Sequence, residues 1–219
     1  MEKLRIFLWY FLRGGGILFL ILFLLYQFYF LRLPERNIPL DLSLFTSPAN
    51  GKIEAVVPWD QEKISVFKND REAMEIFTRE IGERGTLVSI VLNLHNVHYQ
   101  RAPIASTFLG AEYRKGDFKN AVFDAKNATF KNEHNAMLFE TDEGLRYKVI
   151  QIAGFLARRI EDYLTPGQTV QQGEVIGLIK LGSQVSVIFP EEVEVLVEVG
   201  DVVVDGETPI GKINLQNDF

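Results

Sequence analysis

Three histidines, His95, His98 and His134, are the residues of this chain best suited to acid–base chemistry. No other side chain ordinarily changes its charge between pH 5 and 8. A reaction at neutral pH must therefore use one of these imidazoles or a carboxylate with a shifted pKa. The 219 residues include no cysteine, which excludes thiolate catalysis, disulfides and cysteine-ligated metals.

A second candidate for chemistry is a serine in the stretch "GLIKLGSQVSVIFP", Gly177 to Pro190. Here a strand-like run of Ile, Leu, Val and Phe is interrupted by Gly182 and Ser183. Taken alone, the pair predicts a β-bulge or a tight bend that uses the conformational freedom of glycine. Whether Ser183 also takes part in chemistry depends on the rest of the chain.

The length and charge of the chain limit the classes of function. After the first 35 or so residues, the remainder is long enough to bury one core, which predicts a single soluble domain plus an appendage. The formal net charge is −6 at pH 7. This acidic balance argues against nucleic acid as a partner, because phosphate backbones are bound by basic surfaces.

The N-terminal stretch from Ile6 to Leu31 is apolar apart from one arginine, three glycines and one glutamine. We expect it to form a transmembrane helix, since a helix from Gly14 to Leu31 would extend roughly 27 Å, close to the hydrocarbon thickness of a bilayer. The flanking charges are too balanced to orient this helix. The expected organisation is a membrane anchor and linker over residues 1–35 and a catalytic domain over residues 36–219.

The soluble part reads as mostly β, in an α+β arrangement. The stretches "GKIEAVV", "TLVSIVLNL" and "YKVIQIAG" have the β-branched content of strands. Residues 69–82 place Met74, Phe77 and Ile81 at helical spacing, which predicts an amphipathic helix. A second, short helix is expected over residues 155–164.

The C-terminal third contains a faint internal repeat. The sequences "GQTVQQGEVIG" from Gly167 and "GDVVVDGETPIG" from Gly200 share the pattern G-x-x-V-x-x-G-E followed by I-G. This spacing predicts duplicated hairpins and is familiar from lipoyl- and biotinyl-like barrel-sandwich hybrids. A carrier of that kind needs a modifiable lysine at an exposed tip between the repeats. Lys180 stands there in an apolar context, which makes a carrier role the weaker interpretation.

Several separated stretches resemble the phosphatidylserine decarboxylase family of pyruvoyl-dependent lipid enzymes, particularly its short bacterial and archaeal form. The resemblance runs in order from about Leu31 to the end of the chain. The matching stretches are "LRLPER" (31–36), "SPANG" (47–51), "NVHYQRAP" (96–103), "YRKGDFKNA" (113–121), "NEHN" (132–135), "VIQIAGFLARRI" (149–160) and "GLIKLGSQVSVIFP" (177–190).

The resemblance implies that the protein cuts its own Gly182-Ser183 bond. The Ser183 hydroxyl would attack the Gly182 carbonyl, and Ser183 would end as a pyruvoyl group that takes up the substrate amine as a Schiff base and serves as an electron sink. No external cofactor and no metal would then be needed. The short chain ending at Phe219 would stay bound to the long chain as a heterodimer.

Two further residues receive roles from the resemblance. His98 is implied as the acid–base group of "NVHYQRAP", with a hydrogen-bonded structural histidine as the alternative. Arg101 could bind the substrate carboxylate or phosphate through its planar guanidinium, with an ordinary surface ion pair as the alternative. His95 and His134 are expected to be structural.

The main departure from the family pattern is Asn50, where the family has an aspartate thought to orient the base used in self-cleavage. An amide cannot carry that charge, so a mostly uncut precursor is expected. Three explanations are open: an engineered trap for the precursor, a natural variant that uses another base, or deamidation of the Asn50-Gly51 pair. A lesser departure is Ser106, where glycine is usual.

The resemblance implies a membrane-anchored enzyme that converts phosphatidylserine, or archaetidylserine, to the ethanolamine lipid and CO2. Its catalytic domain would lie on the cytoplasmic side of the cell membrane, and a homodimer is left open. The alternative is a processing-deficient or inactive homologue that serves as a lipid-binding protein or a lipoyl-like adaptor. An adaptor of efflux assemblies would carry long coiled-coil heptads, and the sequence has none.

Overall fold

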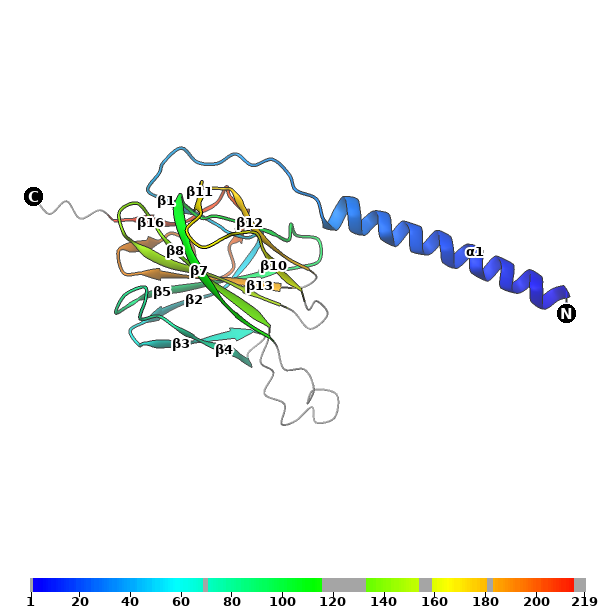
Figure 1. The fold of residues 1–219 in the computed structure, drawn as a ribbon, viewed down its shortest axis with the longest axis horizontal. Coiled ribbons are helices and arrows are strands. Elements are labelled where there is room, and N and C mark those ends of the chain that lie inside the picture. Colours follow the sequence, from blue (N-terminus) through cyan, green and yellow to red (C-terminus); the bar gives the residue numbers. More distant parts are fainter. Residues whose placement is uncertain (1, 69–70, 116–132, 154–158, 181–182, 215–219) are drawn as a thin grey trace, which may run out of the picture. The chain divides into compact units, whose positions relative to one another are not determined.

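A computed structural model describes residues 2–68, 71–115, 133–153, 159–180 and 183–214 of the chain. The chain divides into two units, Met1–Pro34 and Glu35–Phe219. The first unit contains helix α1 (Glu2–Leu25), followed by a π-helical turn (Tyr26–Phe30) (Figure 1). The second unit is built almost entirely of β-strands.

The transmembrane helix expected within residues 1–35 is not supported. No helix in the described part of the chain is both long enough and apolar enough to cross a membrane.

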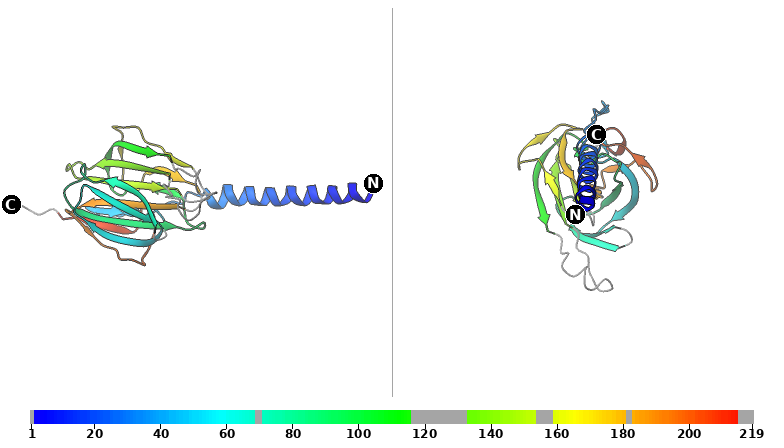
Figure 2. Two further views of the ribbon diagram at one scale, coloured as in Figure 1. Left: turned by 90° about the horizontal axis from the view of Figure 1, so that it is seen from below. Right: turned by 90° about the vertical axis from the view of Figure 1, so that its right-hand side faces the viewer.

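An eight-stranded antiparallel sheet forms the frame of the second unit, and it curls around a central core (Figures 1 and 2). Its strands, in spatial order, are β11 (Thr169–Val170), β7 (Ser106–Arg114), β8 (His134–Glu140), β9 (Arg146–Ile152), β13 (Ser183–Pro190), β5 (Gly85–Leu92), β2 (Gly51–Trp59) and β15 (Val202–Val203).

Three smaller sheets complete the second unit. One contains β1 (Leu44–Thr46), β16 (Pro209–Ile213) and β14 (Val193–Val195), and another contains β10 (Ile160–Asp162), β12 (Val175–Ile179) and β6 (Tyr99–Arg101). The third is the hairpin of β3 (Lys63–Lys68) and β4 (Arg71–Phe77). The mostly β class expected from the sequence is confirmed.

Both helices predicted in the soluble part are wrong. In β4, buried Met74 and Ile76 alternate with exposed Glu75 and Phe77, so the apolar period is the two residues of a strand rather than the spacing of a helix. Residues 160–162 of the second predicted helix form β10, which pairs with β12. Residues 154–158 lie outside the described part of the chain.

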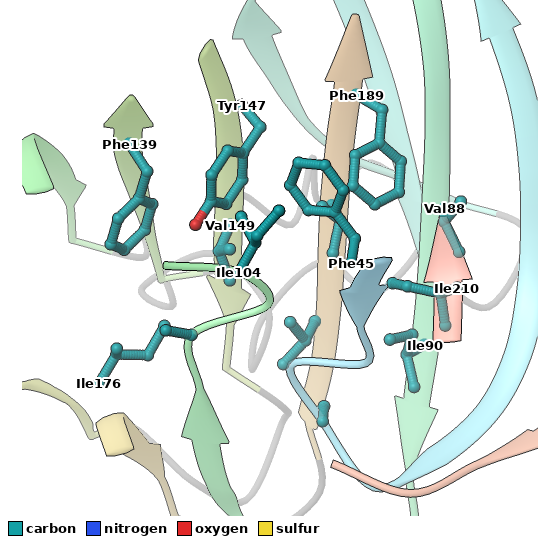
Figure 3. Close-up of a cluster of buried hydrophobic side chains, with 14 of the residues drawn as sticks. Phe45, Val88, Ile90, Ile104, Phe139, Tyr147, Val149, Ile176, Phe189 and Ile210 are labelled. Carbon is teal, nitrogen blue, oxygen red and sulfur yellow. The ribbon is translucent and has the colours of Figure 1, made fainter. Parts of the chain in front are cut away.

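The inner face of the curled sheet holds the main core. Phe45 of β1 makes edge contacts with Tyr147 and Phe189, with ring centroids 5.1 Å apart in both pairs (Figure 3). The rings of Tyr147 and Phe139 stack at 5.2 Å. All four side chains are fully buried, so β1 fills the space between three strands of the large sheet.

A second buried cluster lies between the β3–β4 hairpin and the large sheet. It joins Val66 and Ile76 of the hairpin to Ile150 and Ile188 of the sheet. Because alternate residues of β13 contribute to the two clusters, this strand is buried on both faces. That position explains why "VSVIFP" is a nearly continuous apolar run rather than an alternating one.

The two sequence repeats form similar turns. Gly167 and Gly173 in the first, and Gly200 and Gly206 in the second, all have positive φ, between 73° and 108°. Side chains rarely adopt this conformation, so glycine is needed at these positions. The repeat signal in the sequence therefore marks a real structural repetition.

Phe45 gives a direct test of the core. Replacing it with alanine should lower the free energy of unfolding by about 3–5 kcal/mol, because the cavity would separate the Tyr147 and Phe189 rings. The matched change Phe67→Ala, at a side chain that is 56% exposed, should cost less than about 1 kcal/mol. Urea unfolding of both variants measures the difference, and equal losses would contradict this description of the core.

Candidate functional site

The candidate site lies at the end of the large sheet where β5 finishes and β13 begins. Ser183 pairs with Leu92 there, and Lys52 of β2 pairs with Val91 on the other side of β5. Since neighbouring antiparallel strands bring the start of one beside the end of the next, three segments meet. They are the turn before β2, the segment 93–98 after β5, and the first residues of β13.

Asn50 is held in place by Asn96 at this end of the sheet. The Asn96 side-chain amide donates a hydrogen bond of 2.6 Å to Asn50 Oδ1, while Asn96 Oδ1 accepts one of 2.7 Å from the Asn93 backbone. A carboxylate oxygen at position 50 could accept the same bond from Asn96. An aspartate at position 50, which the family resemblance implies, could therefore keep the hydrogen bond from Asn96.

His98 is completely buried and its ring is oriented by the backbone. Its Nδ1 lies 2.9 Å from the Asn96 carbonyl oxygen, a contact in which Nδ1 carries the proton and Nε2 is the basic nitrogen. The His98 carbonyl accepts a hydrogen bond of 3.2 Å from the Ile179 amide at the end of β12. His98 is thus tied to the strand that leads toward Gly182.

The expected cleavage site is only partly visible. Gly182 lies outside the described residues, and of Ser183 only the backbone is described, as the first residue of β13. The fold brings that backbone, Asn50 and His98 to one end of the sheet. The chemical roles assigned to the three residues stay predictions.

Arg101 occupies a buried ion pair. Its Nε lies 2.9 Å from Asp205 Oδ2, and its NH1 donates a hydrogen bond of 2.8 Å to the Gly173 carbonyl. The side chain is 11% exposed and Asp205 is fully buried, so Arg101 does form an ion pair, as the alternative expected, but a buried one and not one at the surface. Substrate binding by Arg101 stays a prediction.

A row of buried amides behind His98 was missed by the sequence analysis. Gln100 donates to the His98 carbonyl at 2.6 Å, and Gln151 donates to Gln100 at 2.8 Å. Asn135 continues the row, donating to Gln151 at 3.2 Å and to Asp162 at 3.0 Å. The signal that could have revealed it is an amide inside an otherwise apolar buried strand, as Gln151 is in "VIQIAG".

The other two histidines lie elsewhere in the fold and differ in burial. His134 is buried at the start of β8, opposite Ile152 of β9, and His95 is exposed in the segment 93–98. Their expected structural roles are untested. Across the residues that the structure describes, no three histidine, aspartate or glutamate side chains are grouped as a metal site would require.

Lys180, near the expected cleavage site, is paired with Glu161. Its Nζ lies 2.8 Å from Glu161 Oε1. The hydrogen bond from Lys180 lowers the pKa of the Glu161 carboxyl below its usual 4.5. On the same segment, burial raises the pKa of Tyr163 to about 12, so this phenol stays protonated at neutral pH.

Because of the Glu161–Lys180 pair, the free energy of unfolding should change with pH in the acid range. Because the folded pKa of Glu161 lies below the unfolded one, its stabilisation is complete above about pH 4.5 and is lost as the pH falls through the folded value. The advantage of the wild type over Glu161→Gln in urea unfolding should shrink over that acid range. A Glu161 carboxyl resonance that titrates at or above pH 4.5 would contradict this assignment.

A hollow of about 960 Å³ lies at the opposite end of β5 and β13. Arg84, Arg146 and Glu191 are among its lining residues. Each of its three arginines, Arg79, Arg84 and Arg146, is already paired with a glutamate. No residue expected to do chemistry lines the hollow. We therefore place the site at the Asn50–His98 end of the sheet.

Comparisons with known proteins find one matching family model and several similar relatives. The family model described as phosphatidylserine decarboxylase matches residues 23–211. Three similar relatives are each called phosphatidylserine decarboxylase proenzyme. The one from Trichlorobacter lovleyi is 33% identical over 219 residues, covering 94% of this chain and 90% of the relative. Those from Geobacter metallireducens and Wolbachia sp. subsp. Brugia malayi are 35% and 38% identical, covering 85% and 86% of this chain and 77% and 76% of the relatives.

Proposed function

The chain belongs to the phosphatidylserine decarboxylase family of carboxy-lyases, and on that premise we propose that it converts phosphatidylserine, or its ether-linked analogue, to the ethanolamine lipid and CO2. The observation that carries this proposal is the convergence of Asn50, His98 and the Ser183 backbone at one end of the sheet. These are the positions at which the family resemblance expects the chemistry.

The proposed reaction begins with self-cleavage. The Ser183 hydroxyl attacks the Gly182 carbonyl carbon, the peptide C–N bond breaks, and the nitrogen leaves as the free amine of Ser183 on an ester. A base then removes the Cα proton of Ser183 and the Cβ–O bond breaks, which gives the Gly182 carboxylate and dehydroalanine. Addition of one water releases ammonia and leaves a pyruvoyl group.

His98 is the proposed proton carrier. The contact of Nδ1 with the Asn96 carbonyl leaves Nε2 to accept or return a proton. Asn50 is hydrogen-bonded to Asn96, whose carbonyl contacts His98. The neutral amide of Asn50 cannot stabilise an imidazolium as a carboxylate would. In serine proteases the corresponding Asp→Asn change lowers turnover by about 10⁴-fold, so slow self-cleavage is expected here.

A pyruvoyl group derived from Ser183 fits the start of β13. The position is fixed by pairing to Leu92, and the segment that follows Leu92 carries Asn96 and His98. When formed, the group supplies an electron sink for the electrons left as the carboxylate departs as CO2. The task of this chain's own residues is to hold the headgroup in place and to return a proton from His98.

The cut chain would remain assembled through its sheet. The C-terminal piece, Ser183–Phe219, contributes β13, β14, β15 and β16. Of these, β13 lies between β5 and β9 and pairs with both. Two hydrogen-bonded ladders and the buried faces of β13 would therefore hold a heterodimer together without a covalent link.

We also propose that the enzyme works at the cytoplasmic face of the cell membrane, where its phospholipid substrate would be found. Support comes from the exposed apolar side chains of the first unit, such as Ile17 and Phe19 at 61% and 71% exposure. Exposed apolar surface of this kind favours contact with lipid. The lipoyl-like hybrid fold is likewise our proposal, supported by the repeated turns.

A second candidate function is favoured by Asn50 itself. With an amide at this position, the protein could persist as an uncut homologue that binds serine phospholipids, or serves as a lipoyl-like adaptor, without decarboxylating anything. The two candidates differ in one measurable property, which is whether the chain is cut.

Intact mass spectrometry of the purified protein tests the proposed function. We expect Asn50→Asp to accelerate scission at Gly182-Ser183 by up to about 10⁴-fold, and Ser183→Ala to abolish it. The cut protein should release CO2 from phosphatidylserine in vesicles. If the Asn50→Asp protein stays whole and inert, the enzyme proposal fails and the lipid-binding candidate is favoured.

A matched pair of histidine variants tests the proton carrier. In the cut Asn50→Asp protein, His98→Gln should lower kcat for decarboxylation by about 10²–10⁴-fold, because the buried imidazole would no longer transfer a proton. His95→Gln, at an exposed position of the same segment, should leave kcat unchanged. Equal effects of the two changes would remove His98 from the proposed mechanism.

A further inference from the structure

We infer that Asp205, Arg36 and Arg101 form a buried latch that attaches the C-terminal segment Ser183–Phe219 to the rest of the domain and, once the chain is cut, holds the two pieces together. Its role in the cut protein rests on the proposed function. Its role in the uncut protein does not.

The Asp205 carboxylate accepts three hydrogen bonds from two arginines. Arg36 donates two hydrogen bonds to this carboxylate, one of 2.6 Å from NH2 to Oδ1 and one of 3.2 Å from Nε to Oδ2. Arg101 adds a third bond of 2.9 Å to Oδ2. Asp205 is fully buried, and the two arginine side chains are 12% and 11% exposed. The carboxylate therefore depends on these arginines in place of water.

The stretch 35–39, which carries Arg36, lies across both repeats. A Cβ added to Gly173 of the first repeat would stand 2.3 Å from Ile38 Cδ1, and one added to Gly206 of the second would stand 3.1 Å from the same atom. The Asn37 backbone N–H also donates a hydrogen bond of 2.9 Å to Glu207 Oε1. Because the first repeat precedes the expected cut and the second follows it, this stretch bridges the two future pieces.

The latch also reaches the candidate site. The Arg101 amide donates to the Pro48 carbonyl at 2.9 Å, and the Gly206 amide donates to the Ser47 carbonyl at 2.8 Å. The turn that carries Asn50 is therefore held between β6 and the residues around Asp205. Since β6 directly follows His98, the latch positions Asn50 and His98 relative to each other.

The chain offers a matched control for this latch. Arg84 and Glu191 also link the long piece to the C-terminal segment, but their side chains are 67% and 49% exposed. An exposed ion pair adds little to stability, whereas removal of one partner from a buried pair leaves an uncompensated charge. Asp205→Asn and Glu191→Gln thus make the same chemical change in opposite environments.

The first experiment uses full-length Ser183→Ala protein, which cannot be cut. Asp205→Asn should lower the urea midpoint of unfolding clearly, and Glu191→Gln should leave it within error. If Asp205→Asn fails to fold, Arg36→Met tests the same latch, because Asp205 then keeps Arg101. Arg36→Met should lower the midpoint by less than Asp205→Asn does.

The second experiment uses cut Asn50→Asp protein and follows release of the Ser183–Phe219 piece by native mass spectrometry. Asp205→Asn should speed its release by about 100-fold or more, and Glu191→Gln should change it little. The latch is overturned if the Asp205 and Arg36 variants match Glu191→Gln in the first experiment. A chain that is never cut overturns the proposed function instead, and the latch is then judged on the first experiment alone.

Discussion

The antiparallel pairing of β13 with β5 is the constraint on which the rest of the structure depends. It runs from Ser183 opposite Leu92 to Pro190 opposite Gly85, and β9 pairs with the other edge of the same strand. A slip of one residue would exchange the two faces of β13 and move the buried hydroxyl of Ser186, which bonds to Ser89, into the apolar main core. The burial of both faces therefore fixes where Ser183 stands, and with it the end of the sheet at which the proposed chemistry takes place.

Buried polar groups connect the residues expected to act at that end of the sheet to the core. The amides of Gln100, Gln151 and Asn135 link the His98 carbonyl to β9 and β8. The backbone amide of Arg101, whose side chain belongs to the latch, ties the Asn50 turn to β6. Buried polar groups are costly unless they are hydrogen-bonded. A network that satisfies them favours one arrangement of the segments, so the proposed site is built into the core rather than placed on a mobile surface.

The sequence predicted the local features well and the long-range ones poorly. The mostly β class, the buried strand at Tyr147–Ile152 and the repeated turns follow from residue type and spacing. Residues 71–77 were predicted as a helix because Met74 and Phe77 fit a helical period, and pairing with β3 overrides that preference. Arg101 could not be assigned to Asp205, since 104 residues separate them and no local pattern encodes their meeting.

The central claim is that the Ser183 hydroxyl attacks the Gly182 carbonyl at the start of β13. Hydroxylamine treatment of Asn50→Asp protein during self-cleavage tests it most directly, because hydroxylamine cuts esters. The one Asn-Gly peptide bond of the chain, Asn50-Gly51, which the reagent would also attack, is absent from this variant. Tandem mass spectrometry should find a hydroxamate on Gly182 and a free amine on Ser183. A chain without any hydroxylamine-sensitive bond, or with one elsewhere, would contradict the account.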